Sequence, residues 1–217
     1  MEPEALIALR AAAAWRQTHA YPLALVTPGV RNWVGQESSQ MVVGQRLKRM
    51  PQIVLKLTRF DTMRLSQMED IAGCRAVLAN NAEVEAVGKR IEQKWRVRYR
   101  SDYREDGKPG TGYRGVHYVV VRRDRLVEVQ LRTNRQHEWA EAVEQTASRT
   151  RFDLKDGDGP SELVAYFRAA SDVIWAQENG REVDEDLMAE FNELREQVRP
   201  YFTRPARRLR SLRRKSG

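Results

Sequence analysis

The spacing of apolar and polar positions predicts helices at both ends of the chain and strands in its centre. Residues 4–18 are Ala-rich, with apolar side chains roughly on one side, which predicts a helix. Prolines and a glycine in residues 20–31 predict a connection, and residues 38–50 are compatible with a helix. A further helix is expected to begin near Pro51 and to reach Arg59.

The centre has the short apolar runs and the alternation that are typical of strands. Strands are predicted at residues 72–79, 95–101, 116–122 and 126–132, and a helix over 82–94 capped by Asn80 or Asn81. The last two strands form a hairpin, and residues 102–115 form a glycine-containing loop. Helices follow from Asn134 to about 149, from Ser161 to about 179, and from 183 to 198, before Pro200. The expected fold is α/β (α+β): a mixed sheet flanked by N- and C-terminal helices.

Charge divides the chain further. The 217 residues carry a net charge of +8, made of +8 over residues 1–150, −8 over 151–198 and +8 over the Arg-rich tail 199–217. A basic body favours a phosphate-rich ligand, and the tail could contact RNA or tRNA. We expect four segments: an N-terminal helical segment (1–40), a core (41–150), acidic helices (151–198) and the basic tail (199–217).

Several classes of protein are excluded. The single cysteine, Cys74, rules out an internal disulfide framework or a multi-cysteine zinc site. No apolar run has the length of a membrane span, and Glu2 and Glu4 stand where a signal peptide would be basic. These features favour a cytoplasmic protein without a membrane partner.

Four groups of residues suggest chemistry. The stretch Arg46 to Arg59 contains Lys48 and Lys56 and no acid; on charge alone it suits a solvated basic face better than a polyphosphate ligand. Asp70 precedes a strand and is either a magnesium ligand or a capping acid. Arg75 lies within that strand.

The other two groups lie in the loop and the hairpin. The loop offers backbone amides, Lys108 and Tyr113 to a nucleotide, with His117 just after it, although its glycines alone are weak support. On strand 126–132, Glu128, Gln130 and Arg132 share one face, which must be exposed or belong to a site.

Taken together and in this order, the motifs resemble the synthetase domain of the RelA/SpoT family. They are Arg46-Leu47-Lys48 with Lys56-Leu57, Asp70-Ile71-Ala72-Gly73-Cys74-Arg75, Asp102-Tyr103 … Gly112-Tyr113-Arg114-Gly115-Val116-His117, Glu128-Val129-Gln130-Leu131-Arg132-Thr133, and Trp139-Ala140-Glu141. The match covers roughly residues 40–145, and the whole chain resembles a small stand-alone alarmone synthetase.

The resemblance implies a nucleotidyltransferase-like fold and a magnesium-dependent pyrophosphokinase that transfers the β,γ-pyrophosphate of ATP to the 3′-hydroxyl of GDP or GTP. It also implies a role for each matching residue. Arg46 and Arg75 would enclose adenine, and Lys48 and Lys56 would bind the ATP phosphates. Asp70 and Glu128 would hold Mg²⁺, and Glu128 would also help to activate the attacking hydroxyl. The acceptor nucleotide would be bound by Lys108, Tyr113, His117 and Gln130.

Departures from the family pattern leave the acceptor open. Gln52 replaces a serine, Lys108 lies four residues before Gly112 instead of three, and Gly115 replaces a common serine. Two alternatives therefore remain: a toxic relative that pyrophosphorylates the 3′ end of tRNA, and a catalytically weakened nucleic-acid-binding protein. Relatives often form homo-oligomers through their C-terminal helices, and an antitoxin partner stays open.

Overall fold

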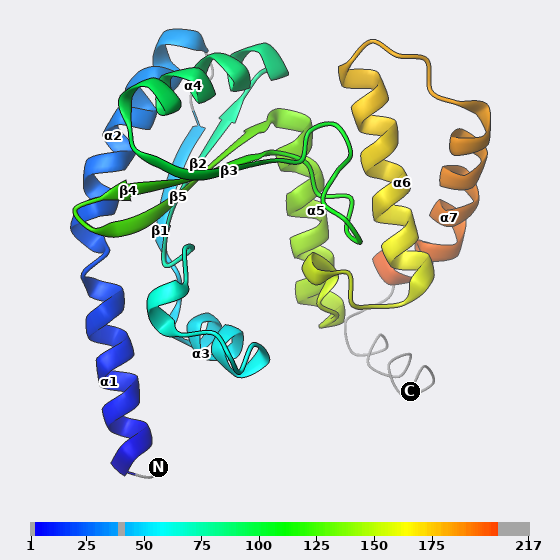
Figure 1. Cartoon of the computed structure of the whole chain (residues 1–217). Helices are drawn as coiled ribbons and strands as arrows, with labels where there is room; N and C mark the ends of the chain where they lie inside the picture. The colour runs from blue at the N-terminus through cyan, green and yellow to red at the C-terminus, as the bar shows by residue number, and fades with distance from the viewer. Residues whose placement is uncertain (1–2, 39–41, 204–217) are drawn as a thin grey trace. The chain divides into compact units, whose positions relative to one another are not determined.

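The computed structural model describes residues 3–38 and 42–203, which form two compact units. The first unit combines residues up to Ser101 with Val116–Thr133, and the second combines Asp102–Gly115 with the chain from Asn134 onward. Figure 1 shows the elements of both units along the chain. The expectations for the tail beyond Thr203 lie outside the described residues.

The first unit is built on one mixed sheet of five strands in the order β1-β2-β5-β4-β3. Its elements are α1 (Pro3–Gln17), α2 (Ala20–Glu37), β1 (Val42–Leu47), α3 (Met50–Arg59), the 3₁₀ turn η1 (Leu65–Gln67), β2 (Ala72–Leu78), α4 (Asn81–Lys94), β3 (Val97–Asp102), β4 (Val116–Arg122) and β5 (Arg125–Thr133). Strand β2 is antiparallel to β1 and parallel to β5, while β4 and β5 are antiparallel. The predicted mixed sheet is therefore confirmed.

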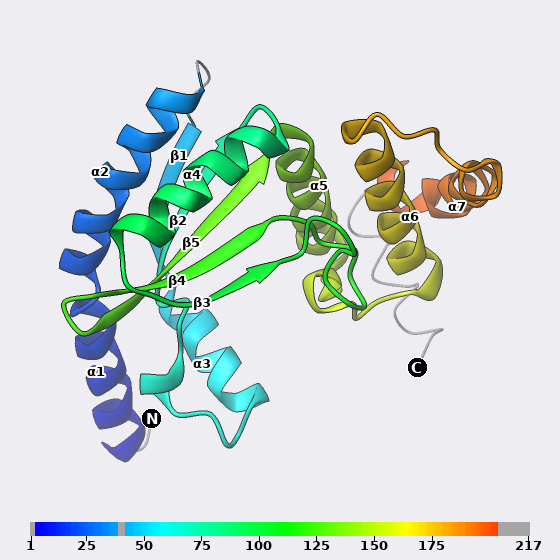
Figure 2. The ribbon, with the colours of Figure 1, turned by 45° about the horizontal axis from the view of Figure 1, so that its top comes forward.

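Helices α2 and α4 cover one face of this sheet, as Figure 2 shows. Apolar residues of β2, β4 and β5, among them Cys74, Val129 and Tyr118, pack with Val30 of α2 and Ile91 of α4 in the main core. Because side chains alternate along a strand, the polar residues between these apolar ones project from the opposite face. That opposite face carries the predicted site residues of the strands.

Helix α2 corrects the prediction of a connection over residues 20–31. Pro22 lies in the first helical turn, where its missing N–H removes no helical hydrogen bond, and Pro28 is accommodated inside the helix. A Cβ at Gly29 would lie 2.7 Å from Cζ2 of Trp95, so this glycine permits a close approach between helix and ring. Burial of the apolar face outweighs the local preference of these residues for a turn.

Strand β1 corrects the prediction of a helix over residues 38–50. Within the described part of that stretch, Val42–Leu47 pairs along its whole length with β2, from Val42 opposite Val77 to Leu47 opposite Ala72. Val43 and Leu47 pack against the core. Pairing with a distant segment, rather than local preference, makes this stretch a strand.

The hairpin and the helix cap follow the predictions. Arg123 and Asp124 join β4 to β5 with positive φ angles of 50° and 57°, as in a tight hairpin turn. The Asn80 side chain accepts a hydrogen bond from the Glu83 N–H and caps α4. The start of β5 and the start of α4 are therefore set by local chemistry.

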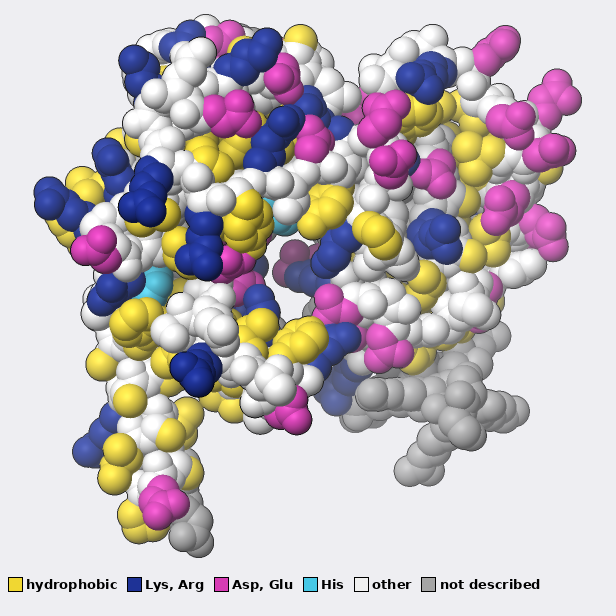
Figure 3. Space-filling view, viewed as in Figure 1, with side chains coloured by type: hydrophobic (Ala, Val, Ile, Leu, Met, Phe, Trp, Pro, Cys, Tyr) yellow, Lys and Arg dark blue, Asp and Glu magenta, His cyan; other side chains and the backbone are white. Residues whose placement is uncertain are grey.

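The second unit contains the loop 102–115 and the helices α5 (Asn134–Thr150), α6 (Ser161–Glu178) and α7 (Glu185–Thr203), with the 3₁₀ turn η2 (Leu154–Asp156). Its core joins Trp139 of α5, Phe167 of α6 and Tyr201 of α7. Figure 3 shows acidic side chains gathered along α7, on the predicted acidic segment. The prediction that the last helix stops before Pro200 is wrong, because α7 continues to Thr203 and the buried Tyr201 anchors its last turn.

None of the helices in the described ranges is both long and apolar enough to cross a membrane.

Candidate active site

Asp70 lies at the centre of a cluster of charges at the start of β2. Lys48, just after β1, donates a hydrogen bond from Nζ to Oδ2 of Asp70 at 2.7 Å, and Nζ of Lys56 on α3 lies 3.1 Å from Oδ1. Burial raises the pKa of the Asp70 carboxyl, but the hydrogen bond and charge of Lys48 and the charge of Lys56 outweigh it, so this pKa lies below its ordinary value. Asp70 is therefore ionised at neutral pH.

Two lysines from separate elements reach Asp70 because of the β1–β2 pairing. The N–H of Lys48 donates to the carbonyl oxygen of Ile71 at 2.8 Å and extends the pairing by one residue. Ile53 of α3 packs with Ile71 and Met68 in a small apolar cluster that fixes α3 beside Asp70. Three predicted site residues, Lys48, Lys56 and Asp70, are thus brought together.

Glu128 forms the second cluster, on the open face of β5. Its Oε1 lies 3.0 Å from Nδ1 of His117, and Nε2 of Gln130 donates to its Oε2 at 2.7 Å. Burial raises the pKa of Glu128, but the hydrogen bond and charge of His117 and the hydrogen bond from Gln130 lower it below the ordinary value. An ionised carboxylate with fixed hydrogen-bond donors suits a metal ligand or a proton acceptor.

The two clusters interact electrostatically. The negative charge of Asp70 acts to raise the pKa of Glu128, and both carboxylates do the same to Glu69. The pKa of Glu69 is raised, mainly by burial, against the charges of Arg98 and Lys56. Glu69 also accepts a hydrogen bond from the Tyr99 hydroxyl. Mutually repelling carboxylates favour the binding of a cation among them.

Mg²⁺ suits this donor set. Among the residues that the structure describes, no group of three or more His, Cys, Asp or Glu side chains has the arrangement of a metal site. Mg²⁺ is commonly held by about one or two carboxylates, with waters and substrate phosphates as its remaining ligands. Asp70 and Glu128 would therefore hold the ion together with the phosphates of a bound nucleotide.

Arg46 and Arg75 lie on the same open face, diagonally across the β1–β2 pair. Arg46 is opposite Gly73, and Arg75 is opposite Gly44. A Cβ at Gly44 would meet nothing within 4 Å, and one at Gly73 would meet only the carbonyl oxygen of Arg46, at 4.0 Å. Two guanidinium groups separated by positions without side chains suit a planar ring stacked between them.

The register aligns these residues in a row across the sheet. Gly44 is opposite Arg75, Arg75 is opposite Gln130, and Gln130 is opposite His117. Residues directly opposite each other in neighbouring strands place their side chains on the same face. The predicted adenine-binding and acceptor-binding residues of the sheet therefore share one surface.

Lys108 and Tyr113 belong to the second unit. Tyr113 is half-buried, with its ring 6.1 Å from that of Tyr103 and 6.4 Å from that of Trp139. The Lys108 N–H donates to the carbonyl oxygen of Tyr113 at 2.7 Å, which closes the loop on itself. These two predicted acceptor-binding residues are thus linked to each other through the loop backbone.

Sequence reasoning missed Gly44 and Glu69 as members of the site. Gly44 belongs to the strand that was predicted as a helix, so its position opposite Arg75 could not be anticipated. Glu69 precedes Asp70 directly, and this pair of acids was the available signal.

One family model matches the central part of the chain. Residues 45–149 match the family model described as the region found in RelA/SpoT proteins. The matched residues contain all the predicted site residues. None of the curated proteins matches the chain.

Solved structures show the same fold. Small alarmone synthetase 1 from Bacillus subtilis, bound to its product pppGpp, is 21% identical with a TM-score of 0.62, over 83% of this chain and 97% of that one. A GTP pyrophosphokinase family protein from Streptococcus pneumoniae is 22% identical with a TM-score of 0.56, over 94% of this chain and 100% of that one. The similarity in fold therefore extends well beyond residues 45–149.

Proposed function

We propose that the chain is an ATP:nucleotide 3′-pyrophosphotransferase that makes (p)ppGpp from ATP and GDP or GTP. The observation that supports this most strongly is the pair of ionised carboxylates, Asp70 and Glu128, with lysines around one and acceptor-binding candidates around the other. The similarity to a synthetase bound to pppGpp supports the same acceptor class.

In the proposed reaction the 3′-hydroxyl oxygen of the acceptor attacks the β-phosphorus of ATP. The new O3′–Pβ bond forms as the bond from Pβ to the oxygen of the α-phosphate breaks, and AMP leaves. Glu128 accepts the hydroxyl proton, and His117 and Gln130 orient its carboxylate. Lys48 and Lys56 bind the transferred phosphates. Mg²⁺, when bound, supplies neutralisation of charge on the phosphate oxygens.

Binding of ATP requires a rearrangement around Asp70. In the structure both lysines are bonded to the Asp70 carboxylate, so they would have to turn away from it to reach the phosphates of ATP, and the freed carboxylate would then be able to hold Mg²⁺. Positive charge from Arg46 and Arg75 remains at the adenine end. The site thus exchanges internal ion pairs for substrate contacts.

The test is transfer of label from γ-labelled ATP to GDP, GTP or deacylated tRNA, with Mg²⁺ or with chelator. Label in a guanosine tetra- or pentaphosphate, lost in Asp70→Ala and Glu128→Gln, is the expected result. Glu85→Gln is the matched control, because Glu85 is on α4 on the opposite side of the sheet, with a side chain 41% exposed. Label in tRNA alone would replace the proposal with the toxin alternative, and absence of any transfer would favour the nucleic-acid-binding alternative.

Two further partners remain predictions. Assembly into a homo-oligomer through the C-terminal helices is tested by native mass spectrometry of the purified chain. An antitoxin partner is tested by expressing the chain and measuring growth arrest. Relief of the arrest by a (p)ppGpp hydrolase, or by the product of a gene beside the one that encodes this chain, would indicate such a partner.

A further inference from the structure

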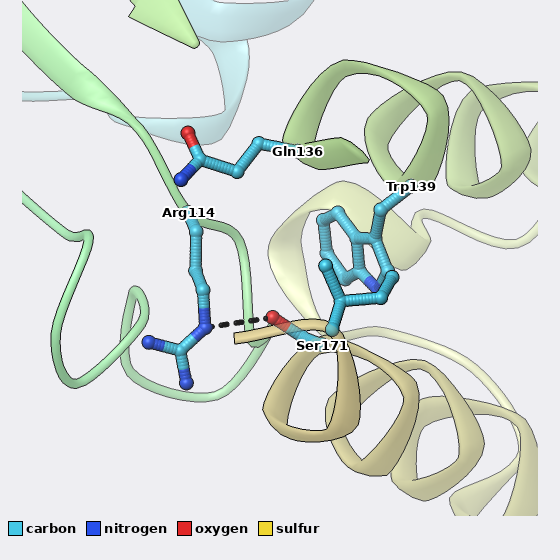
Figure 4. Close-up of a pocket in the computed structure, with 5 residues that line it drawn as sticks. Arg114, Gln136, Trp139 and Ser171 are labelled. Atoms are coloured by element: carbon cyan, nitrogen blue, oxygen red, sulfur yellow. Dashed lines mark hydrogen bonds between the residues drawn. The ribbon is translucent and has the colours of Figure 1, made fainter. Parts of the chain in front are cut away.

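Arg114 is a buried arginine at the end of the loop 102–115, and only 5% of its side chain is exposed. Its Nη1 donates to the carbonyl oxygens of Arg104, at 2.6 Å, and Glu105. Its Nε donates to Oγ of Ser171 at 3.0 Å, as Figure 4 shows, and its Nη2 to Oδ1 of Asp172 at 2.6 Å. One guanidinium thus connects the beginning of the loop to α6.

Ser171 continues this connection to the other side of the loop. Its hydroxyl accepts from Arg114 and donates to the carbonyl oxygen of Gly112 at 2.5 Å. A Cβ at Gly112 would lie 3.0 Å from Cα of Arg168, and the φ angle of Gly112 is +74°. The loop backbone is therefore held against α6 at residues 104–105 and again at 112.

The held segment carries the two predicted acceptor-binding residues of the loop. Lys108 and Tyr113 are joined by a backbone hydrogen bond, and Tyr113 directly precedes Arg114. Any movement of the Arg114 backbone therefore moves the Tyr113 ring.

We propose that Arg114, held by Ser171 and Asp172, is a positioning residue that sets the affinity for the acceptor nucleotide by fixing the loop 102–115 on α6. This inference rests on the proposed function, since it assigns the loop to the acceptor. Arginine suits the role because its planar group has about five N–H donors in a fixed arrangement, which lysine cannot reproduce.

The first test is steady-state kinetics of Arg114→Ala, Arg114→Lys and Ser171→Ala. The KM for the acceptor should rise between about tenfold and about a hundredfold, because misplacement of a binding group by about 1 Å has effects of this size. The KM for ATP should stay within about twofold of wild type, since the loop is not assigned to ATP. Arg114→Lys should fail to restore acceptor binding. Arg195→Ala, an exposed arginine on α7, is the matched control.

The second test does not depend on activity. Hydrogen exchange of the amides of Lys108 and Gly112, both hydrogen-bonded within the loop, should accelerate in Arg114→Ala and Ser171→Ala but not in Arg195→Ala. If Arg114→Ala does not fold, Ser171→Ala and the milder Asp172→Asn carry both tests. Unchanged loop exchange, or equal rises in both KM values, would overturn the proposal. Failure of the wild-type chain to transfer label to any acceptor would instead refute the proposed function. Hydrogen exchange of the loop amides would still test whether Arg114 attaches the loop to α6.

Discussion

Replacing Asp70 by asparagine should strengthen the binding of ATP in the absence of metal while abolishing transfer. In the wild-type chain Lys48 and Lys56 must leave a carboxylate at 2.7 and 3.1 Å before they can bind phosphate. Asp70→Asn removes the one negative charge that holds both lysines and that would also repel the incoming triphosphate. The same substitution removes a proposed magnesium ligand.

The size of the effect follows from the exposure of the ion pairs. The side chains of Lys48, Lys56 and Asp70 are 17%, 30% and 24% exposed, so water still screens the pairs. At about 1 kcal/mol for each such pair, the two together contribute about 2 kcal/mol, or about thirtyfold in the dissociation constant of ATP.

The assay is a titration with a fluorescent ATP analogue, first with chelator and then with Mg²⁺. Asp70→Asn should bind more tightly than wild type with chelator, and addition of Mg²⁺ should improve its affinity less than it improves that of wild type. Glu85→Gln serves again as control. Weaker or unchanged ATP binding by Asp70→Asn with chelator would refute the reasoning, because it would mean that Asp70 does not compete with ATP for Lys48 and Lys56.

Three further predictions concern stability and reactivity. The pKa of Asp70 in the folded chain is lowered from 3.8, so the ionised carboxylate stabilises the fold above pH 3.8, and this stabilisation is lost as the pH falls through the folded pKa. The difference in melting temperature between wild type and Asp70→Asn should therefore shrink on acidification below pH 3.8. A constant difference would contradict this. Gly88→Ala should destabilise the fold by about 1–3 kcal/mol in chemical denaturation, because its Cβ would lie 2.4 Å from the hydroxyl of the buried Tyr118. An unchanged denaturation midpoint would disprove this steric conflict. Burial raises the pKa of Cys74 to about 11, so alkylation at pH 8 should require unfolding, and Cys74→Ala should retain transfer; rapid labelling of the native chain would count against a buried thiol.

The hairpin shows what local pattern predicts well. Alternation on β5 placed Glu128 and Gln130 on one face and Val129 on the other, and the structure confirms this division. The short turn at residues 123–125 also fixed the register that brings His117 opposite Gln130. Both signals act over a few residues, so the sequence carries them directly.

The edge of the sheet shows what local pattern misses. Residues 42–47 become a strand by pairing with β2, about thirty positions further along, and no periodicity within the segment records that partner. The contact of Lys48 with Asp70 depends on the same pairing. The resemblance to the RelA/SpoT family assigned these residues to one site, whereas their spacing alone left them as a basic stretch and a separate acid.

The row Gly44, Arg75, Gln130 and His117 has a consequence for how substrate preference changes over evolution. The row crosses four strands, and strands are about 4.8 Å apart, so its ends are separated by about 14 Å of hydrogen-bonded backbone. The sheet residues proposed for ATP, Arg46 and Arg75, lie on β1 and β2, and the sheet residues proposed for the acceptor lie on β4 and β5. A lineage can therefore exchange one acceptor for another by substitutions on the hairpin and in the loop 102–115, and inherit its use of ATP unchanged.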